Sequence, residues 1–311
     1  MEHTETIFGK IEPDITQRLV SRREAILRGA AVGSTVAAGL AMASAPIALA
    51  ALSREAFGQS APLTVQQVID FALKLEIFEN EFYKAVLGIS SVPAQNAAFA
   101  VVRAMVPASA LPAIQQIQKH EVSHVAFLTA NGAKNTLNLD GTSFDFTGGR
   151  GSGTGPFLQA TTDLNFLLLT AQGAEDTGVR AYKGQAPALQ VNPAVLEAAL
   201  RIHSVEARHA SKIRRLRRMT GATAVKYSGT ITNADPGAGN VSNPAPGAVT
   251  ALGLVYAGED NVTQGGLNVT TLPNLPSGIN VMNAATEAFD EPLTAAQVIA
   301  IVQPFFIPAL S

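Results

Sequence analysis

The sequence predicts an all-α core of long helices, followed by a long C-terminal extension that is rich in Gly, Asn and Pro. Three observations predict this class. Hydrophobic residues make up 47% of the 311 residues and charged residues 15%, which is ample for a buried core and too little charge for a disordered chain. Apolar residues recur at helical spacing between residues 64 and 220. No sustained period is present in residues 228–280.

The composition also narrows the chemistry that this chain can perform. It contains no Cys, which excludes disulfides, thiolate metal sites, iron–sulfur clusters and Cys nucleophiles. A metal ion would therefore have to be held by His, Asp and Glu. The formal net charge is -2, so the molecule as a whole does not attract nucleic acid or anionic lipid.

Residues 1–60 have the features of an export signal. The Arg22-Arg23 pair precedes residues 29–53, an uncharged stretch rich in Ala and Gly, and small residues follow. This order resembles a twin-arginine signal, so we expect export to the periplasm or cell envelope by a route known for proteins that are already folded. A retained membrane anchor and a packed core helix are the alternatives. Ala, Gly, Ser and Thr give little transfer energy into lipid, so no stable membrane span is expected once the signal is cleaved.

Five helical stretches are predicted before Gly221. In order, they cover residues 64–87, 96–105, 112–130, 156–182 and 193–219. Thr64 and Gln67 form a capping box at the start of the first stretch. Pro residues separate the second from the third, and Asn131-Gly132 ends the third as a C-cap. A Pro begins the last stretch at its first turn.

The remainder of the chain is expected to be irregular. Residues 228–280 predict ordered loops with one or two short strands, such as residues 224–227. Near the end, Thr294 and Gln297 cap a last short helix through about Val302. The chain is thus divided into the signal segment, a helical bundle over residues 61–220 and an extension over residues 221–311.

Two further segments carry features of phosphate or nucleic-acid sites. Residues 148–155 are rich in Gly but lack a Lys-Ser/Thr ending and a preceding strand, so we expect a loop and not a phosphate cradle. Residues 212–218 are a basic run at a helix end. We expect a solvated last turn whose cations suit the helix dipole, and no nucleic-acid partner.

The helical region repeats one chemical pattern. Two helices each carry a Glu followed seven residues later by a Tyr on the same face, and two others each carry Glu-x-x-His, which also shares a face. The residues are Glu76 with Tyr83, Glu121 with His124, Glu175 with Tyr182, and Glu206 with His209. Two such helix pairs in a four-helix bundle bring four carboxylates and two imidazoles to its centre. We expect the tyrosines to be packing residues with a hydroxyl partner and not redox-active groups.

This combination of side chains suits a pair of metal ions. Carboxylates can bridge two hard cations and cancel their charge, and imidazole nitrogen completes each shell. The candidate ligands are Glu76, Glu121, His124, Glu175, Glu206 and His209. The alternatives are polar faces of surface helices, or a bundle that has lost its metal. The second copy of the pattern favours a site for two Fe or Mn ions, since an oxygen-rich set accepts both.

Some neighbours of these residues depart from the pattern. Glu79 lies one turn after the first Glu and could compete for its role, and Asp176 adjoins Glu175. Gly173 and Gly178 flank the same Glu, and a Gly inside a helix weakens it by about 1 kcal/mol. A kink or bulge in that helix is therefore expected.

Residues 64–220 resemble the ferritin-like superfamily and, more narrowly, the ferritin-like domain family that includes plant desiccation-related proteins. The resemblance is carried by the segments Phe71–Tyr83, Gly173–Tyr182 and Ala288–Thr294. It implies an up-down four-helix bundle with one long crossover. It also implies that Glu121 and Glu206 bridge the metals, that Glu76 and Glu175 are terminal ligands, and that His124 and His209 serve one metal each.

Two functions follow as hypotheses. The first is a di-iron or di-manganese oxidoreductase outside the cytoplasm that acts on dioxygen or peroxide between the bridging glutamates. The second is a non-catalytic metal-binding or structural protein of the envelope, active in stress such as drying. The wide extension favours the second, because such a surface often packs against a partner or a sister subunit. The extension also makes a ferritin-type cage less favourable.

Overall fold

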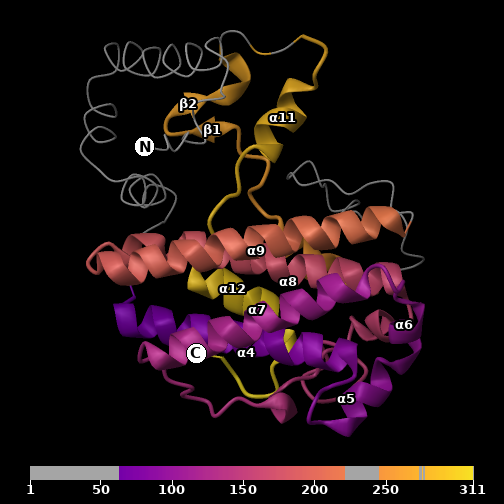
Figure 1. The fold of residues 1–311 in the computed structure, drawn as a ribbon. Helices are drawn as coiled ribbons and strands as arrows, with labels where there is room; N and C mark the ends of the chain where they lie inside the picture. Colours follow the sequence, from indigo (N-terminus) through magenta and orange to yellow (C-terminus); the bar gives the residue numbers. More distant parts are fainter. Residues whose placement is uncertain (1–62, 221–244, 273–274, 276, 311) are drawn as a thin grey trace, which may run out of the picture. The chain divides into compact units, whose positions relative to one another are not determined.

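The structure is a computed structural model that describes residues 63–220, 245–272, 275 and 277–310. These residues are mostly helical, which confirms the predicted all-α class (Figure 1). Among these residues, none of the helices combines the length and the hydrophobicity that crossing a membrane requires. The predicted signal segment and the predicted strand at residues 224–227 lie outside the described residues.

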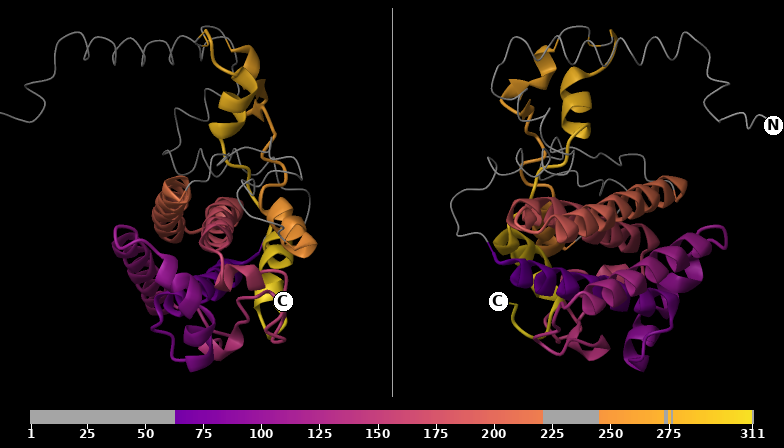
Figure 2. Two further views of the ribbon diagram at one scale, coloured as in Figure 1. Left: turned by 90° about the vertical axis from the view of Figure 1, so that its right-hand side faces the viewer. Right: turned by 60° about the vertical axis from the view of Figure 1, so that its left-hand side comes forward.

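Four long helices form the core of the described chain. They are α4 (Val65–Leu87), α7 (Leu111–Ala130), α8 (Leu164–Gln185) and α9 (Pro193–Met219). Helix α4 packs along α7 and α8 packs along α9, and the two pairs face one another (Figures 1 and 2). Two short helices, α5 (Pro93–Ala98) and α6 (Ala100–Met105), fill the connection between α4 and α7. The predicted stretch at residues 96–105 is therefore two helices that meet at Phe99.

Side-chain contacts between these helices show in which direction each helix runs relative to its neighbours. The contacts are Glu76–His124 and Asn80–Gln118 between α4 and α7, Gln172–Arg217 and Asp176–Arg214 between α8 and α9, and Glu76–Tyr182 and Tyr83–Glu175 between α4 and α8. In each set, the numbers rise on one helix as they fall on the other, so each of these helix pairs is antiparallel. It follows that α7 and α8 point the same way. The segment between them, residues 131–163, is the long crossover that the resemblance implied.

Helix α8 continues as one α-helix through its glycines, so the expected bulge is absent. The glycines instead permit close approach. A Cβ at Gly184 would lie 1.9 Å from the carbonyl oxygen of Leu293, where the C-terminal segment crosses the helix. A Cβ at Gly178 would lie 3.3 Å from a carboxylate oxygen of Glu206. Glycine lowers the helix propensity at both positions, but its lack of a side chain lets a backbone carbonyl or a carboxylate approach the helix closely.

The C-terminal extension contains more helix than the sequence indicated. Its elements are α10 (Pro246–Val255), β1 (Thr263–Gln264), β2 (Leu267–Asn268), α11 (Val281–Glu287) and α12 (Ala295–Val302). The expectation of loops over residues 228–280 is thus wrong at α10 and corrected there. Helix α10 begins with Pro246 in its first turn and buries Ala248, Leu252 and Val255 on one face, an apolar pattern too short to stand out among Gly and Pro. The predicted last helix is confirmed as α12, with the Thr294–Gln297 capping box.

A buried ion pair attaches this extension to α8. Arg180 and Glu259 are each 2% exposed, and the Nε atom of Arg180 lies 3.0 Å from an oxygen of Glu259. The guanidinium also donates to the backbone carbonyls of Val255, Ala257 and Glu291. Glu259 in turn accepts a hydrogen bond of 2.8 Å from the backbone N–H of Glu291. One arginine of the bundle therefore orders two separate stretches of the extension.

The basic run at the end of α9 divides between surface and interior. Arg214 and Arg217 are buried, and they donate hydrogen bonds of 2.5 Å to Asp176 and 2.7 Å to Gln172 on α8. The predicted solvated run is therefore wrong for these two residues. It holds for Lys212, Arg215 and Arg218, which are exposed. The division follows from helical spacing, since residues three apart share the face that packs on α8.

The Gly-rich loop is organised around a carboxylate. Asp145 is buried, and its two oxygens accept hydrogen bonds from the backbone N–H groups of Thr147, Gly151 and Gly153 and from the Thr147 hydroxyl. These donors are occupied within the chain, which agrees with the expectation of a loop and not a phosphate cradle. Burial raises the pKa of Asp145, but the hydrogen bonds to its charged form outweigh burial and lower the pKa overall.

Replacing Asp145 with Asn is expected to destabilise the protein by about 1–3 kcal/mol, because the amide nitrogen cannot accept the two bonds that one oxygen now receives. A folded pKa below the ordinary value of 3.8 means that the contribution of Asp145 is present above that pH and is lost as pH falls through the folded pKa. Urea unfolding should therefore show a constant difference between about pH 5 and 7. The exposed Asp260→Asn change is the control, and an equal loss there would contradict this account.

Candidate metal centre

The six candidate ligands converge in the middle of the four long helices. Glu76 lies on α4, Glu121 and His124 on α7, Glu175 on α8, and Glu206 and His209 on α9. All six are buried, and Glu121, Glu175 and Glu206 are 0% exposed. Each of the four helices thus contributes at least one buried candidate ligand to the centre.

The first half of the centre surrounds His124. Its Nδ1 atom lies 3.0 Å from Oε2 of Glu76, 3.1 Å from Oε2 of Glu121 and 3.2 Å from Oε1 of Glu206. Three carboxylates from three helices therefore meet one imidazole nitrogen. The ligand atoms of these four residues all lie within 4.8 Å of one another.

The second half repeats the arrangement around His209. Its Nδ1 atom lies 3.0 Å from Oε1 of Glu121, 3.2 Å from Oε2 of Glu175 and 3.7 Å from Oε2 of Glu206. These ligand atoms also lie within 4.8 Å of one another. Glu121 and Glu206 belong to both halves, and each directs one oxygen to each histidine. Glu76 and Glu175 each belong to one half.

Unpaired polar atoms test whether these residues fit metal ions. Oε1 of Glu121, Oε2 of Glu175, both oxygens of Glu206 and Nδ1 of His209 are buried without a hydrogen-bond partner. One Nδ1 hydrogen can serve one acceptor well, so two imidazoles cannot satisfy this many carboxylate oxygens. Buried charge without a partner is strongly unfavourable. The donor set of oxygens and one nitrogen per cluster suits Fe or Mn, so the residues fit and could hold metal ions.

The ionisation of the centre reflects the crowding of charge. Burial raises the pKa of Glu121 well above its ordinary value, and the charge of Glu206 adds to this. Burial alone would lower the pKa of His124, but hydrogen bonds to the surrounding carboxylates raise it to about 12. Burial alone would raise the pKa of Glu206, and the nearby imidazoles of His124 and His209 lower it to about 2. Bound protons thus offset the negative charge of the carboxylates. A metal ion that binds to an imidazole nitrogen must displace the proton on that nitrogen.

The two tyrosines hold the terminal glutamates from the opposite helix. Tyr83 on α4 donates a hydrogen bond to Oε1 of Glu175 on α8, and Tyr182 on α8 donates one of 2.5 Å to Oε1 of Glu76 on α4. The spacing in the sequence placed each Tyr on the face of its own Glu, whereas the structure pairs it with the other one. Burial raises the pKa of both phenols, so both remain neutral donors. The second oxygen of each Glu stays directed at a histidine.

Three neighbours of the centre have separate places. His120 stacks on His209 with ring centres 5.1 Å apart, and its Nδ1 atom lies 2.8 Å from Nε2 of His209. Its position one residue before Glu121 was the only signal for it in the sequence. Glu79 is buried beside the centre but belongs to neither ligand cluster. Asp176 accepts hydrogen bonds from Arg214 and Tyr256, so it does not compete with Glu175.

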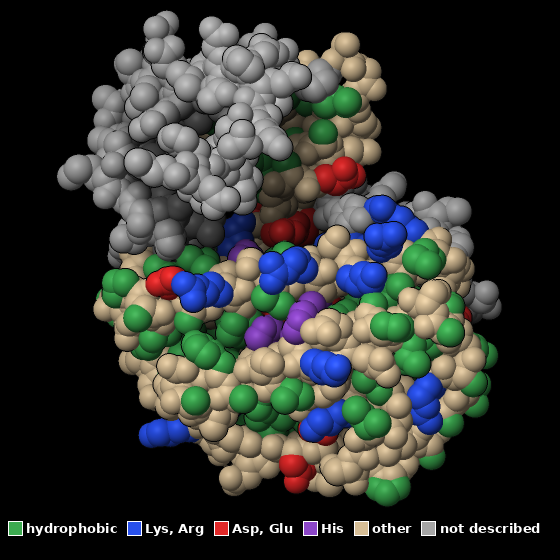
Figure 3. All heavy atoms as spheres, in the orientation of Figure 1, with side chains coloured by type: hydrophobic (Ala, Val, Ile, Leu, Met, Phe, Trp, Pro, Cys, Tyr) green, Lys and Arg blue, Asp and Glu red, His purple; other side chains and the backbone are tan. Residues whose placement is uncertain are grey.

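The half-exposed ring of His120 lies between His209 and the surface of the bundle. The face drawn in Figure 3 shows histidine side chains between the long helices, with Lys and Arg side chains nearby. Next to the surface, the Nε2 atom of His120 lies 2.7 Å from the side-chain nitrogen of Gln116. The His209 half of the centre is therefore separated from solvent by one further imidazole.

An all-α bundle with two buried carboxylate and imidazole clusters that could hold metal ions defines the class of this protein. The family model described as a ferritin-like domain matches residues 64–219. The chain belongs to the ferritin-like domain family. No match was found among curated proteins, and none among solved structures. The matched residues begin at the cap of α4 and end at the last turn of α9, so they span the whole four-helix core.

Proposed function

We propose that this protein binds two Fe or Mn ions at its buried centre and reacts with dioxygen or peroxide there. The observation that carries the proposal is the shared position of Glu121 and Glu206, each of which directs one oxygen to each histidine. Carboxylates in that position would bridge a pair of ions. Such a pair supplies redox chemistry toward dioxygen or peroxide when it is bound.

Each residue of the centre has a role under this proposal. Glu76 and His124 would hold one ion and Glu175 and His209 the other, with the two shared glutamates between them. Tyr83 and Tyr182 orient the terminal glutamates by hydrogen bonding to the oxygen that faces away from the histidine. Partners of this kind are worth about 10–100-fold in metal affinity. The apolar packing around the centre excludes bulk water.

Export completes the proposal. The Arg22-Arg23 pair and the uncharged stretch that follows support a twin-arginine signal, which would deliver the protein to the periplasm or cell envelope. Export in the folded state suits a buried centre of this kind, because the ions could be loaded before export. No nucleic-acid partner is proposed, since the net charge is only -2.

A second function, non-catalytic metal binding or a structural role in the envelope under stress such as drying, is favoured by the extension. The Arg180–Glu259 ion pair joins the extension to α8 instead of leaving it as a separate arm. A surface of this extent suits a partner or a sister subunit. The resemblance to desiccation-related proteins points the same way.

Two measurements separate these functions. Elemental analysis of protein isolated from its own cell envelope should give two Fe or Mn per chain, and the loaded protein should consume dioxygen or hydrogen peroxide over many turnovers. Metal-free protein is the control for consumption. Bound metal without turnover would establish the non-catalytic function, and a chain isolated without metal would overturn both metal-binding functions.

A further inference from the structure

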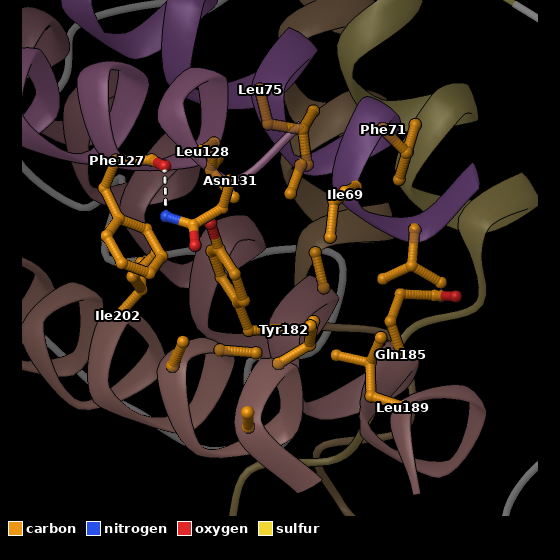
Figure 4. Close-up of a pocket in the computed structure, with 17 residues that line it drawn as sticks. Ile69, Phe71, Leu75, Phe127, Leu128, Asn131, Tyr182, Gln185, Leu189 and Ile202 are labelled. Atoms are coloured by element: carbon orange, nitrogen blue, oxygen red, sulfur yellow. Dashed lines mark hydrogen bonds between the residues drawn. The ribbon is translucent and has the colours of Figure 1, made fainter. Parts of the chain in front are cut away.

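A cavity of about 130 Å³ lies at one end of the bundle. It is partly open to the surface and is lined by the first turns of α4, the last turn of α7, the end of α8 and the start of α9 (Figure 4). Its wall includes Ala72, Leu128, Tyr182, Ala198, Ala199 and Ile202. Apart from three polar residues, the lining is aliphatic or aromatic. Among the residues that the structure describes, no charged side chain lines it.

The polar residues of the lining are Asn131, Tyr182 and Gln185. The side-chain amide of Asn131 donates a hydrogen bond of 2.7 Å to the carbonyl of Phe127, drawn in Figure 4. The hydroxyl of Tyr182 donates to Glu76. Two of the three polar groups are thus engaged within the protein. A wall of this kind favours an uncharged apolar molecule, because a charged or strongly polar one would lose its hydration without replacement.

The cavity adjoins one half of the metal centre. Ala72, Leu128 and Ile202 each lie four residues from a candidate ligand, namely Glu76, His124 and Glu206, and so one turn away on the same helix face. Tyr182 belongs to both places, because it lines the cavity and also hydrogen-bonds Glu76. An occupant would therefore contact the ring whose hydroxyl orients a terminal glutamate.

We propose that this cavity is a binding site for a small uncharged apolar molecule, or for the apolar end of a larger one, beside the Glu76–His124 half of the centre. An engineered apolar cavity of about 150 Å³ in another protein binds benzene, so a molecule of about that size is expected to fit here. A hydrocarbon group of about six carbons fits the volume of about 130 Å³. Binding does not depend on the proposed function, whereas a role for the occupant as substrate rests on it.

Benzene is the probe, and metal-free full-length protein is the receptor. We expect saturable binding by isothermal titration calorimetry and a rise in melting temperature with benzene concentration. Filling the cavity with Ala198→Phe should weaken binding at least tenfold. The half-exposed Ala198 makes this change tolerable, and Ala199→Leu is the second filling variant. Ala113→Phe, at an equally half-exposed alanine of α7 outside this cavity, should bind as the wild type does.

Absence of benzene binding by the wild type, or equal binding by the Ala198→Phe and Ala199→Leu variants, would overturn the proposal. The same samples are analysed for metal after loading. Normal metal content without benzene binding rejects the cavity site alone. Benzene binding by a chain that takes up no metal rejects the proposed function alone.

Discussion

A chain that carries both Glu121→Ala and Glu206→Ala is expected to bind no metal ion at the centre, whereas the wild type is proposed to bind two. These two residues are the only carboxylates common to both ligand clusters of the described chain, so their removal leaves each histidine with one glutamate. Glu76→Ala alone removes a ligand from one cluster only. It should lower the content from two ions toward one while the His209 half is retained. Elemental analysis after loading and desalting measures both results.

Glu197→Ala is the matched control, because this glutamate lies on α9 like Glu206 but is exposed. Its metal content should equal that of the wild type. Circular dichroism shows whether the double variant keeps its helices, so that loss of metal is not confused with loss of fold. Equal metal in the double variant and the wild type would place the ions elsewhere and refute the centre.

At a pH at which Glu259 is ionised, replacing Arg180 with Met is expected to destabilise the protein by about 3–5 kcal/mol, the usual loss when one partner of a buried ion pair is removed. The change leaves Glu259 buried without its guanidinium and removes the donor to three backbone carbonyls. Adding Glu259→Gln to Arg180→Met should recover part of the loss, because no uncompensated carboxylate then remains. Urea unfolding of the wild type, both single variants and the double variant measures the coupling.

The pKa of Glu259 predicts how this loss of stability should change with pH. Burial raises the pKa of Glu259 from 4.5 to about 8, although Arg180 beside it lowers it. Between those two values the folded state binds more protons than the unfolded state, so stability falls as pH rises through the window. Without Arg180 the folded pKa rises further, and the loss in Arg180→Met should be larger at pH 8 than at pH 5. A loss independent of pH would show that the carbonyl contacts, and not the ion pair, dominate.

Helical periodicity and ligand spacing predicted much of the fold and the members of the candidate centre. Glu-x-x-His needs only helix geometry to bring both side chains to one face, and its repetition indicated two halves. The pairing of Tyr83 with Glu175, and of Tyr182 with Glu76, needed more. It depends on the antiparallel packing of α4 on α8, which no local pattern contains.

The two wrong predictions, a loop at residues 246–255 and a fully solvated basic run, also failed because they depend on packing between segments that are remote in sequence. Residues 246–255 form a helix because α8 offers an apolar face on which three buried side chains can pack, and that face is remote in sequence. Arg214 and Arg217 are buried because Asp176 and Gln172 on α8 accept their hydrogen bonds. Composition alone assigns Gly- and Pro-rich stretches to loops and runs of arginine to solvent. Tertiary partners overrule both assignments.

The crossed tyrosine contacts lock the register of α4 against α8. Because the contacts lie two helical turns apart and run in both directions, sliding either helix by one residue, about 1.5 Å, would break both at once. The spacing of the two terminal carboxylates is therefore set by the protein before any ion binds. Under the proposed function, an incoming ion would have to match that fixed spacing, and ionic size would become a criterion by which the protein chooses among cations.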